Sequence, residues 1–248
     1  MLNPCVHQAA GLQELALQTV PRLVAVTSHG PRQDELQLLW GLCSAWADSG
    51  FAVVVLDGHA QESRENPGLL QLLDNRLEPL DHEECQAEWT VLPSAFGFDR
   101  LTHHGTVSDV LGELFQNYGV VLIYSDSSVM TQLLKGTDLM PLLVLSPVKT
   151  STLTAYQALK RLLLDAQLRP TIANIAQTPT IQRSASSQSP LTHLQNCAMT
   201  FLGYDLKPLT VTAALDADGS MSDDVNGLAL RMLENAIFLD RHLTERFH

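Results

Sequence analysis

The residues best placed for chemistry are 28–35, a loop between a predicted strand and a predicted helix. Such a loop binds a nucleotide's phosphates when backbone N–H groups converge on the anion, a lysine meets the phosphates and a Ser/Thr hydroxyl binds Mg²⁺. This loop has one glycine, Gly30, a proline without an N–H, and Asp34 and Glu35 where the lysine and the helix start are required. Carboxylates suit a helix N-terminus but repel a triphosphate. We therefore predict a strand-to-helix turn capped by Asp34 rather than a working phosphate site.

Two apolar runs flank this loop and the helix that follows it. Residues 23–27 and 53–56 are nearly unbroken apolar stretches, which is the pattern of parallel strands covered on both faces. Between them, apolar residues recur at helical spacing, and Gly50 supplies a stop signal. The recurring residues are Leu36, Leu39, Trp40, Cys43 and Ala47.

The same alternation of strands and helices continues along the chain. We predict further strands over residues 89–92, 120–124, 141–145, 171–175 and 209–213, and helices over 107–116, 151–164, 191–202 and 223–248. This alternation predicts an α/β fold with a doubly wound, mostly parallel sheet and helices on both faces. The last helix mixes acidic and basic residues, so we expect it to pack on the core and to make no membrane contact.

Composition limits the classes of function. The chain has 248 residues and a net charge of −12, which argues against a nucleic-acid-binding face. Its four cysteines are far apart, and the metal-ligand types in residues 81–85 are adjacent in sequence, so we expect no metal site. We also see no signal sequence and no membrane-length apolar run, which predicts a cytoplasmic protein.

The first residues form a separate predicted element. Asn3 followed by Pro4 is a helix start signal, and apolar residues continue at helical spacing up to Pro21. We therefore divide the chain into an N-terminal helix over residues 1–20 and a single α/β domain over residues 21–248.

Together these landmarks resemble the MinD/ParA family of dimerising P-loop ATPases, and more narrowly the FlhG (FleN) regulators of flagellar number and placement. The family's opening strand, K-G-G-x-G-K-T loop, helix and second strand overlay residues 23–57 without a gap. On this overlay the family's signature lysine falls on Gly30, its phosphate-binding lysine on Glu35 and its Mg²⁺-binding threonine on Leu36. The resemblance thus implies that three functional positions of the loop are changed.

Other family positions are partly kept. Asp57 matches the acid that helps to activate water, whereas Tyr124 stands at the Walker B aspartate, with Asp126 two residues beyond it. Residues 149–156 look like the family's P-T-S-I-T-D-A-Y, and Asn174 matches the asparagine that reads adenine. Without the two lysines, the stabilisation of the phosphoryl group is lost. The resemblance therefore implies a vestigial nucleotide site, no catalytic residues, and no binding of ATP or Mg²⁺ as cofactors.

The N-terminal helix carries a second resemblance. FlhG proteins have a D-Q-A-x-x-L-R helix that stimulates the GTPase FlhF, and this chain keeps Gln8, Ala9 and Leu12 while His7 and Gln13 replace the charged residues. These kept residues are implied to bind an FlhF-type GTPase or another flagellar or polar protein.

Three hypotheses follow from these resemblances. The first is a non-hydrolysing regulator, a pseudo-ATPase that acts through protein partners in flagellar placement. The second is a degenerate MinD-like scaffold of another localisation or secretion system, and the third is a weakly active ATPase that uses Arg32 or a partner's lysine. Because the family's dimer depends on ATP and on the missing signature lysine, we expect a monomer or a nucleotide-independent dimer.

Overall fold

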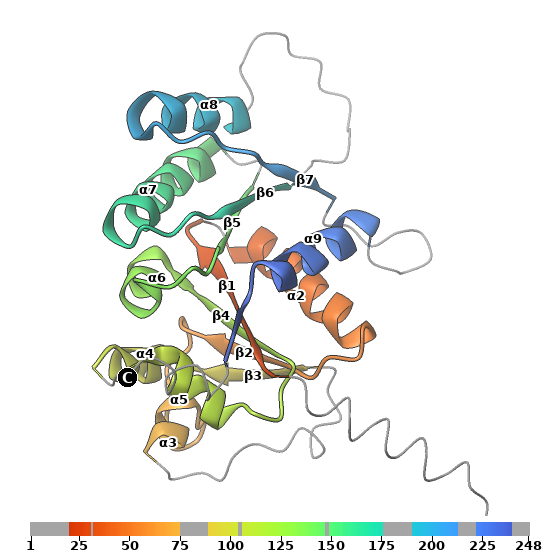
Figure 1. Ribbon diagram of the computed structural model, residues 1–248, viewed down its shortest axis with the longest axis vertical. Helices are drawn as coiled ribbons and strands as arrows, with labels where there is room; N and C mark the ends of the chain where they lie inside the picture. The colour runs from red at the N-terminus through yellow and green to blue at the C-terminus, as the bar shows by residue number, and fades with distance from the viewer. Residues whose placement is uncertain are drawn as a thin grey trace, which may run out of the picture.

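The computed structural model describes residues 20–30, 32–74, 89–103, 106–146, 149–175, 190–212 and 222–239. These residues form one sheet of eight strands in the order β3-β2-β4-β1-β5-β6-β7, with β8 paired to β1 beside this path (Figure 1). The strands are β1 (Arg22–Ser28), β2 (Val53–Asp57), β3 (Trp89–Pro93), β4 (Val120–Asp126), β5 (Leu142–Leu145), β6 (Thr171–Ile175), β7 (Leu209–Val211) and β8 (Ile237–Phe238). All neighbouring pairs are parallel except β8 with β1, which confirms the predicted mostly parallel sheet.

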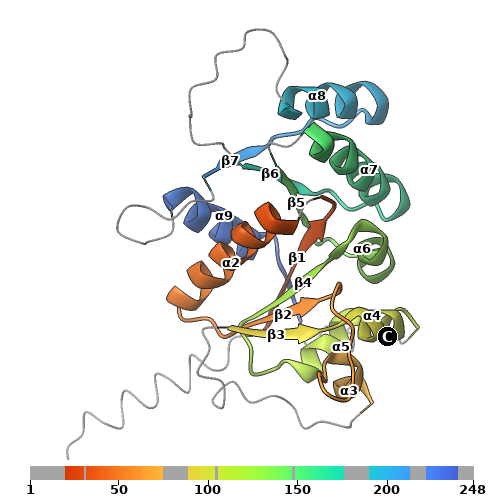
Figure 2. The ribbon, with the colours of Figure 1, turned by 180° about the vertical axis from the view of Figure 1, so that it is seen from behind.

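Helices cover both faces of the sheet (Figures 1 and 2). One face packs against α2 (Arg32–Asp48) and α9 (Asp223–Glu234). The other face packs against α3 (Leu69–Leu73), α4 (Ala95–Thr102), α5 (Val107–Leu114), α6 (Ser127–Leu134), α7 (Lys149–Asp165), α8 (Pro190–Cys197) and the π-helical turn η2 (Ala198–Leu202). The doubly wound α/β architecture predicted from the sequence is therefore confirmed.

The apolar runs explain this layering. Along β1, Leu23 and Ala25 face the cluster under α3–α7, while Val24 and Val26 face the cluster under α2 and α9. Because successive side chains of a strand point to opposite faces, a strand buried on both sides needs apolar residues at every position. All four side chains are buried, as this requirement predicts.

The C-terminal prediction was wrong in its extent. The sequence predicts one helix over residues 223–248, but α9 ends at Glu234 and the chain turns into β8. There Phe238 pairs with Arg22 of β1, and its ring lies 5.3 Å from the Arg22 guanidinium. Pairing with β1 thus outweighs local helical spacing, and residues 240–248 lie outside the described part of the chain.

Two smaller differences concern a helix end and two short helices. Helix α2 begins at Arg32, so Asp34 lies in its first turn and is not the cap that the sequence predicts. Helices α4 and α6 are not predicted by the sequence analysis. The predicted N-terminal helix lies outside the described residues.

Candidate functional site

The candidate site lies at the carboxyl edge of the sheet, where β1, β4 and β2 end, with β4 between the other two. In the parallel register, Ser28 of β1 stands beside Asp126 of β4, and Tyr124 of β4 stands beside Asp57 of β2. β1 has β4 on one side and β5 on the other, and helix α2 starts just beyond its loop. In open α/β sheets, ligands bind outside the carboxyl ends of strands at such a point.

The central residue of this edge is Glu35, in the first turn of α2. Its side chain is only 2% exposed and turns back into the loop. One carboxylate oxygen, Oε1, accepts hydrogen bonds from the backbone N–H groups of His29 and Gly30, both at 3.1 Å. The other, Oε2, accepts from the hydroxyl of Ser28 at 2.7 Å and from the hydroxyl of Tyr124 at 3.1 Å. Every partner is a donor, which is the pattern that an ionised carboxylate needs.

The loop therefore still forms an anion-binding cradle, but the anion comes from the chain itself. Converging backbone N–H groups are the means by which loops bind phosphate. Here the N–H groups of His29 and Gly30 converge on the Glu35 carboxylate. The sequence predicts that Glu35 repels a phosphate, whereas its place inside the cradle emerges only from the fold.

His29 holds the loop against the neighbouring elements. Its ring is 3% exposed, and Nε2 donates to the backbone carbonyl of Val144 at the end of β5. Nδ1 lies 3.1 Å from the hydroxyl oxygen of Thr154 on α7, and Nε2 lies 4.0 Å from Oε1 of Glu35. His29 is absent from the residues predicted for the site, because its partners are far from it in sequence.

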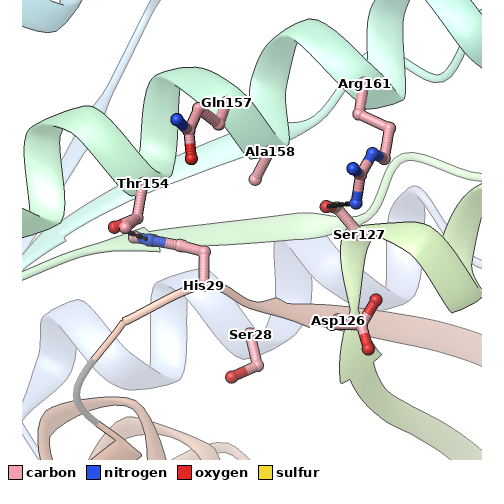
Figure 3. Close-up of a pocket in the computed structure, with 8 residues that line it drawn as sticks. All are labelled: Ser28, His29, Asp126, Ser127, Thr154, Gln157, Ala158 and Arg161. Carbon is pink, nitrogen blue, oxygen red and sulfur yellow. Dashed lines mark hydrogen bonds between the residues drawn. The ribbon is translucent and has the colours of Figure 1, made fainter.

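A cleft adjoins the loop between β1, α6 and α7 (Figure 3). It has a volume of about 240 Å³, and Arg161 reaches across it from α7 to donate to the Ser127 hydroxyl at 3.4 Å. The cleft therefore offers hydroxyl, amide and charged groups to a small polar ligand. Its lining residues are Ser28, His29, Asp126, Ser127, Thr154, Gln157, Ala158 and Arg161.

Two acids of the predicted nucleotide site make local backbone contacts. Oδ1 of Asp126 accepts from the backbone N–H groups of Ser128 and Val129, so Asp126 caps helix α6. Oδ1 of Asp57 accepts from the N–H of His59 at 2.9 Å, within the turn after β2. Both carboxylates thus accept backbone hydrogen bonds at the end of a strand and stabilise the turn or helix start that follows.

The remaining predicted residues are dispersed. Leu36 packs among the apolar residues between α2 and the sheet, and Asn174 lies on β6, separated from β1 by β5. From the predicted vestigial site, hydrogen bonds to Glu35 join Gly30 and Tyr124, and Asp57 is the register partner of Tyr124. The predicted partner-binding residues lie outside the described part of the chain; they are Gln8, Ala9 and Leu12.

The described residues show neither a metal site nor a membrane span. Nowhere among them do three or more His, Cys, Asp or Glu side chains gather as a metal ion would require. Their helices are all too short or too polar to cross a bilayer.

Comparison with known proteins identifies the fold. No protein-family model matches the chain, and no curated protein matches it in sequence. Its structure is similar to the MinD cell division protein of Aquifex aeolicus, with a TM-score of 0.56 and 16% identity over 88% of this chain and 99% of that one. It is also similar to a ParA family ATPase from Chlorobium tepidum, with a TM-score of 0.51 and 16% identity over 86% of this chain and 98% of that one. The chain thus has the MinD/ParA fold.

A third similar structure is a MinC:MinD cell division protein complex from Aquifex aeolicus. The TM-score is 0.58 and the identity 14%, over 88% of this chain and 98% of that one. At such identities the likeness is one of fold, and the function of this chain must be argued from its own residues.

Proposed function

We propose that this chain is a non-hydrolysing member of the MinD/ParA fold, a pseudo-ATPase that acts by binding other proteins. The observation that carries the proposal is the Glu35 carboxylate, which occupies the loop's anion cradle. By the family resemblance, a phosphate-binding lysine would stand at this position. A cation that attracts phosphate is thereby exchanged for an anion that competes with it.

The electrostatic cost of this exchange is large. Two unit charges of like sign at 4 Å repel by about 4 kcal/mol at an effective dielectric constant of 20. Because about 1.4 kcal/mol corresponds to a factor of ten, this term alone weakens phosphate binding about a thousandfold. Loss of the lysine's attraction and of the Mg²⁺-binding threonine adds to it, since phosphoryl transfer depends on such groups.

The second changed position supports the same proposal. Tyr124 stands where the resemblance places the Walker B aspartate, and its hydroxyl donates to Glu35 at 3.1 Å. Two carboxylates at these positions would repel each other, whereas glutamate and tyrosine form a buried hydrogen bond. The two replacements are therefore mutually compatible, and the hydrogen bond between them supports a site that works without nucleotide.

A turnover assay and a sedimentation measurement test the pseudo-ATPase proposal. We expect phosphate release from MgATP by the purified chain to equal the no-protein background, and Asp57→Asn to leave it unchanged. We also expect sedimentation to be the same with and without MgATP. Turnover above background that Asp57→Asn abolishes, or ATP-induced dimerisation, would refute the proposal.

For the cellular role, we propose regulation of flagellar number or placement in the cytoplasm, with an FlhF-type GTPase as partner. The support is the FlhG-like pattern of Gln8, Ala9 and Leu12 in the sequence. In a GTPase assay, the full chain should stimulate the FlhF-type enzyme, Gln8→Ala should reduce the stimulation, and the control Gln18→Ala outside the pattern should not. Equal stimulation by all three, or none, would remove the flagellar part of the proposal.

A further inference from the structure

We infer that Glu35 is a tethered ligand in a preformed oxyanion receptor, and that a small carboxylate from solution takes its place when the side chain is shortened. The inference rests on the proposed function and deepens it, because it states what keeps the site closed without nucleotide. It concerns the receptor formed by Ser28, His29, Gly30 and Tyr124, which we call the carboxylate receptor.

The receptor matches both oxygens of a carboxylate. Two backbone N–H groups, of His29 and Gly30, bind Oε1, and two hydroxyls, of Ser28 and Tyr124, bind Oε2. Hydrogen bonds to an ionised acceptor are shorter and stronger than neutral ones. Four donors directed at two oxygens thus define a site for a planar anion of the size of formate.

The receptor is formed by elements other than the helix that supplies Glu35. Ser28 belongs to β1, Tyr124 to β4, and His29 and Gly30 to the loop, while Glu35 lies on α2. The His29 ring forms hydrogen bonds with the backbone of β5 and with a side chain of α7. These bonds hold the loop in place independently of Glu35. Shortening Glu35 therefore removes the ligand and leaves the donors in place. The part-buried N–H groups of His29 and Gly30 lose this acceptor, and the hydroxyls of Ser28 and Tyr124 lose it too but still lie 3.5 Å from each other.

Donors that have lost the Glu35 carboxylate make the shortened variant sensitive to anions. A ligand that binds the native state alone raises stability in proportion to the logarithm of its concentration above Kd. Formate fits the space that the carboxylate leaves, and its two oxygens meet the same four donors. Glu35→Ala should consequently be less stable than the natural chain and should regain stability in formate.

The experiment compares thermal unfolding in sodium formate and sodium chloride at equal ionic strength and pH. For Glu35→Ala, we expect the melting temperature to rise with the logarithm of the formate concentration above Kd, by on the order of 3 °C more than in chloride. The natural chain and Glu35→Gln should respond equally to the two salts, because their side chains fill the receptor. In the double variant Glu35→Ala/Tyr124→Phe, one donor is missing, so a higher formate concentration should be needed.

A second variant, Glu35→Ser, repeats the test with a smaller loss of buried contacts. An equal response of Glu35→Ala and Glu35→Ser to formate and chloride would overturn the inference, as would a formate response in Glu35→Gln. If neither shortened variant folds in chloride, formate during refolding should raise the yield of folded protein, and no rise would also overturn it.

The test separates this inference from the proposed function. If formate has no specific effect while the natural chain ignores MgATP, the tethered-ligand inference fails and the proposed function stands. If the natural chain binds MgATP in a Mg²⁺-dependent way, the proposed function fails whatever formate does.

Discussion

At the scale of single residues, the site depends on one buried carboxylate and on the donors that surround it. The sequence shows that Glu35 and Tyr124 depart from the family pattern, but it does not show that they touch. Tyr124 lies on β4, whose place beside β1 is a property of the whole sheet. The departure of the loop from the family pattern was thus visible in the sequence, while the hydrogen-bond network around Glu35 was not.

Tyr124→Phe tests the strength of this network. The variant keeps the ring but removes the hydroxyl that bonds to the charged Glu35, so we expect it to lower the free energy of unfolding by about 1.5–3 kcal/mol. The matched control is Tyr118→Phe, in which another buried tyrosine loses a hydroxyl that donates to neutral Thr90 at 3.4 Å. Urea unfolding should show a smaller loss for the control, about 0.5–1.5 kcal/mol. Equal losses would mean that the Glu35 contact has no special strength.

At the scale of elements, a second buried carboxylate joins two helix starts. The Glu62 side chain is 6% exposed and accepts hydrogen bonds from the backbone N–H groups of Leu70 in α3 and of Phe96 and Gly97 in α4. These groups have no partner within their own helices, because the first N–H groups of any helix lack one. The sequence analysis predicts neither α4 nor this role. An acid in a loop that caps two separate helices leaves no periodic pattern in the sequence.

Glu62→Ala should therefore destabilise the region of α3 and α4. Three N–H groups lose their acceptor, and we expect a loss on the order of 3 kcal/mol in the free energy of unfolding. Glu62→Gln retains acceptor oxygen and should cost less, and the exposed neighbour Glu65→Ala should change stability by less than about 0.5 kcal/mol. Equal effects of the Glu62 and Glu65 substitutions in urea unfolding would contradict this role.

Cys43 tests whether the inner side of helix α2 is buried against the sheet. Burial raises the pKa of the Cys43 thiol to about 12, so the folded state favours the protonated form. The stability from burying this thiol is complete below the pKa of the unfolded chain, about 8.5, and is lost as pH rises from there toward 12. With Cys5, Cys85 and Cys197 replaced by serine, Cys43 should resist a thiol reagent at pH 8 and react in denaturant. Rapid reaction in the native state would contradict the packing of α2.

At the scale of the whole molecule, the fold was largely predictable from the sequence. Apolar runs such as residues 53–56 mark strands buried on both faces, and their alternation with helices specifies the doubly wound sheet. The end of α9 was not predictable, because apolar residues such as Ile237 and Phe238 suit a buried helix as well as a strand. The start of β1, which β5 does not reach, pairs with them and selects the strand. Pairing between strands that are far apart in the sequence likewise determines which residues meet at the site.

The same scale bears on the proposal that this MinD/ParA fold acts without nucleotide. Residues that would bind a ligand at the carboxyl edge instead bond to one another, as Glu35 does to Ser28 and Tyr124, or cap helices, as Asp126 does. The anion cradle at this edge is thus filled by the chain's own carboxylate, while the cleft beside it stays open. We expect the molecule to present one fixed surface to its partners, whereas a nucleotide-driven relative would present two.

The most direct test of this account is a calorimetric titration of the purified full chain with ATP, with and without Mg²⁺. Because the Glu35 carboxylate fills the cradle and repels phosphate, we predict no Mg²⁺-dependent heat of binding. Tight binding that requires Mg²⁺ would contradict the account, since it would show that Glu35 leaves the loop and that the site is a working nucleotide switch.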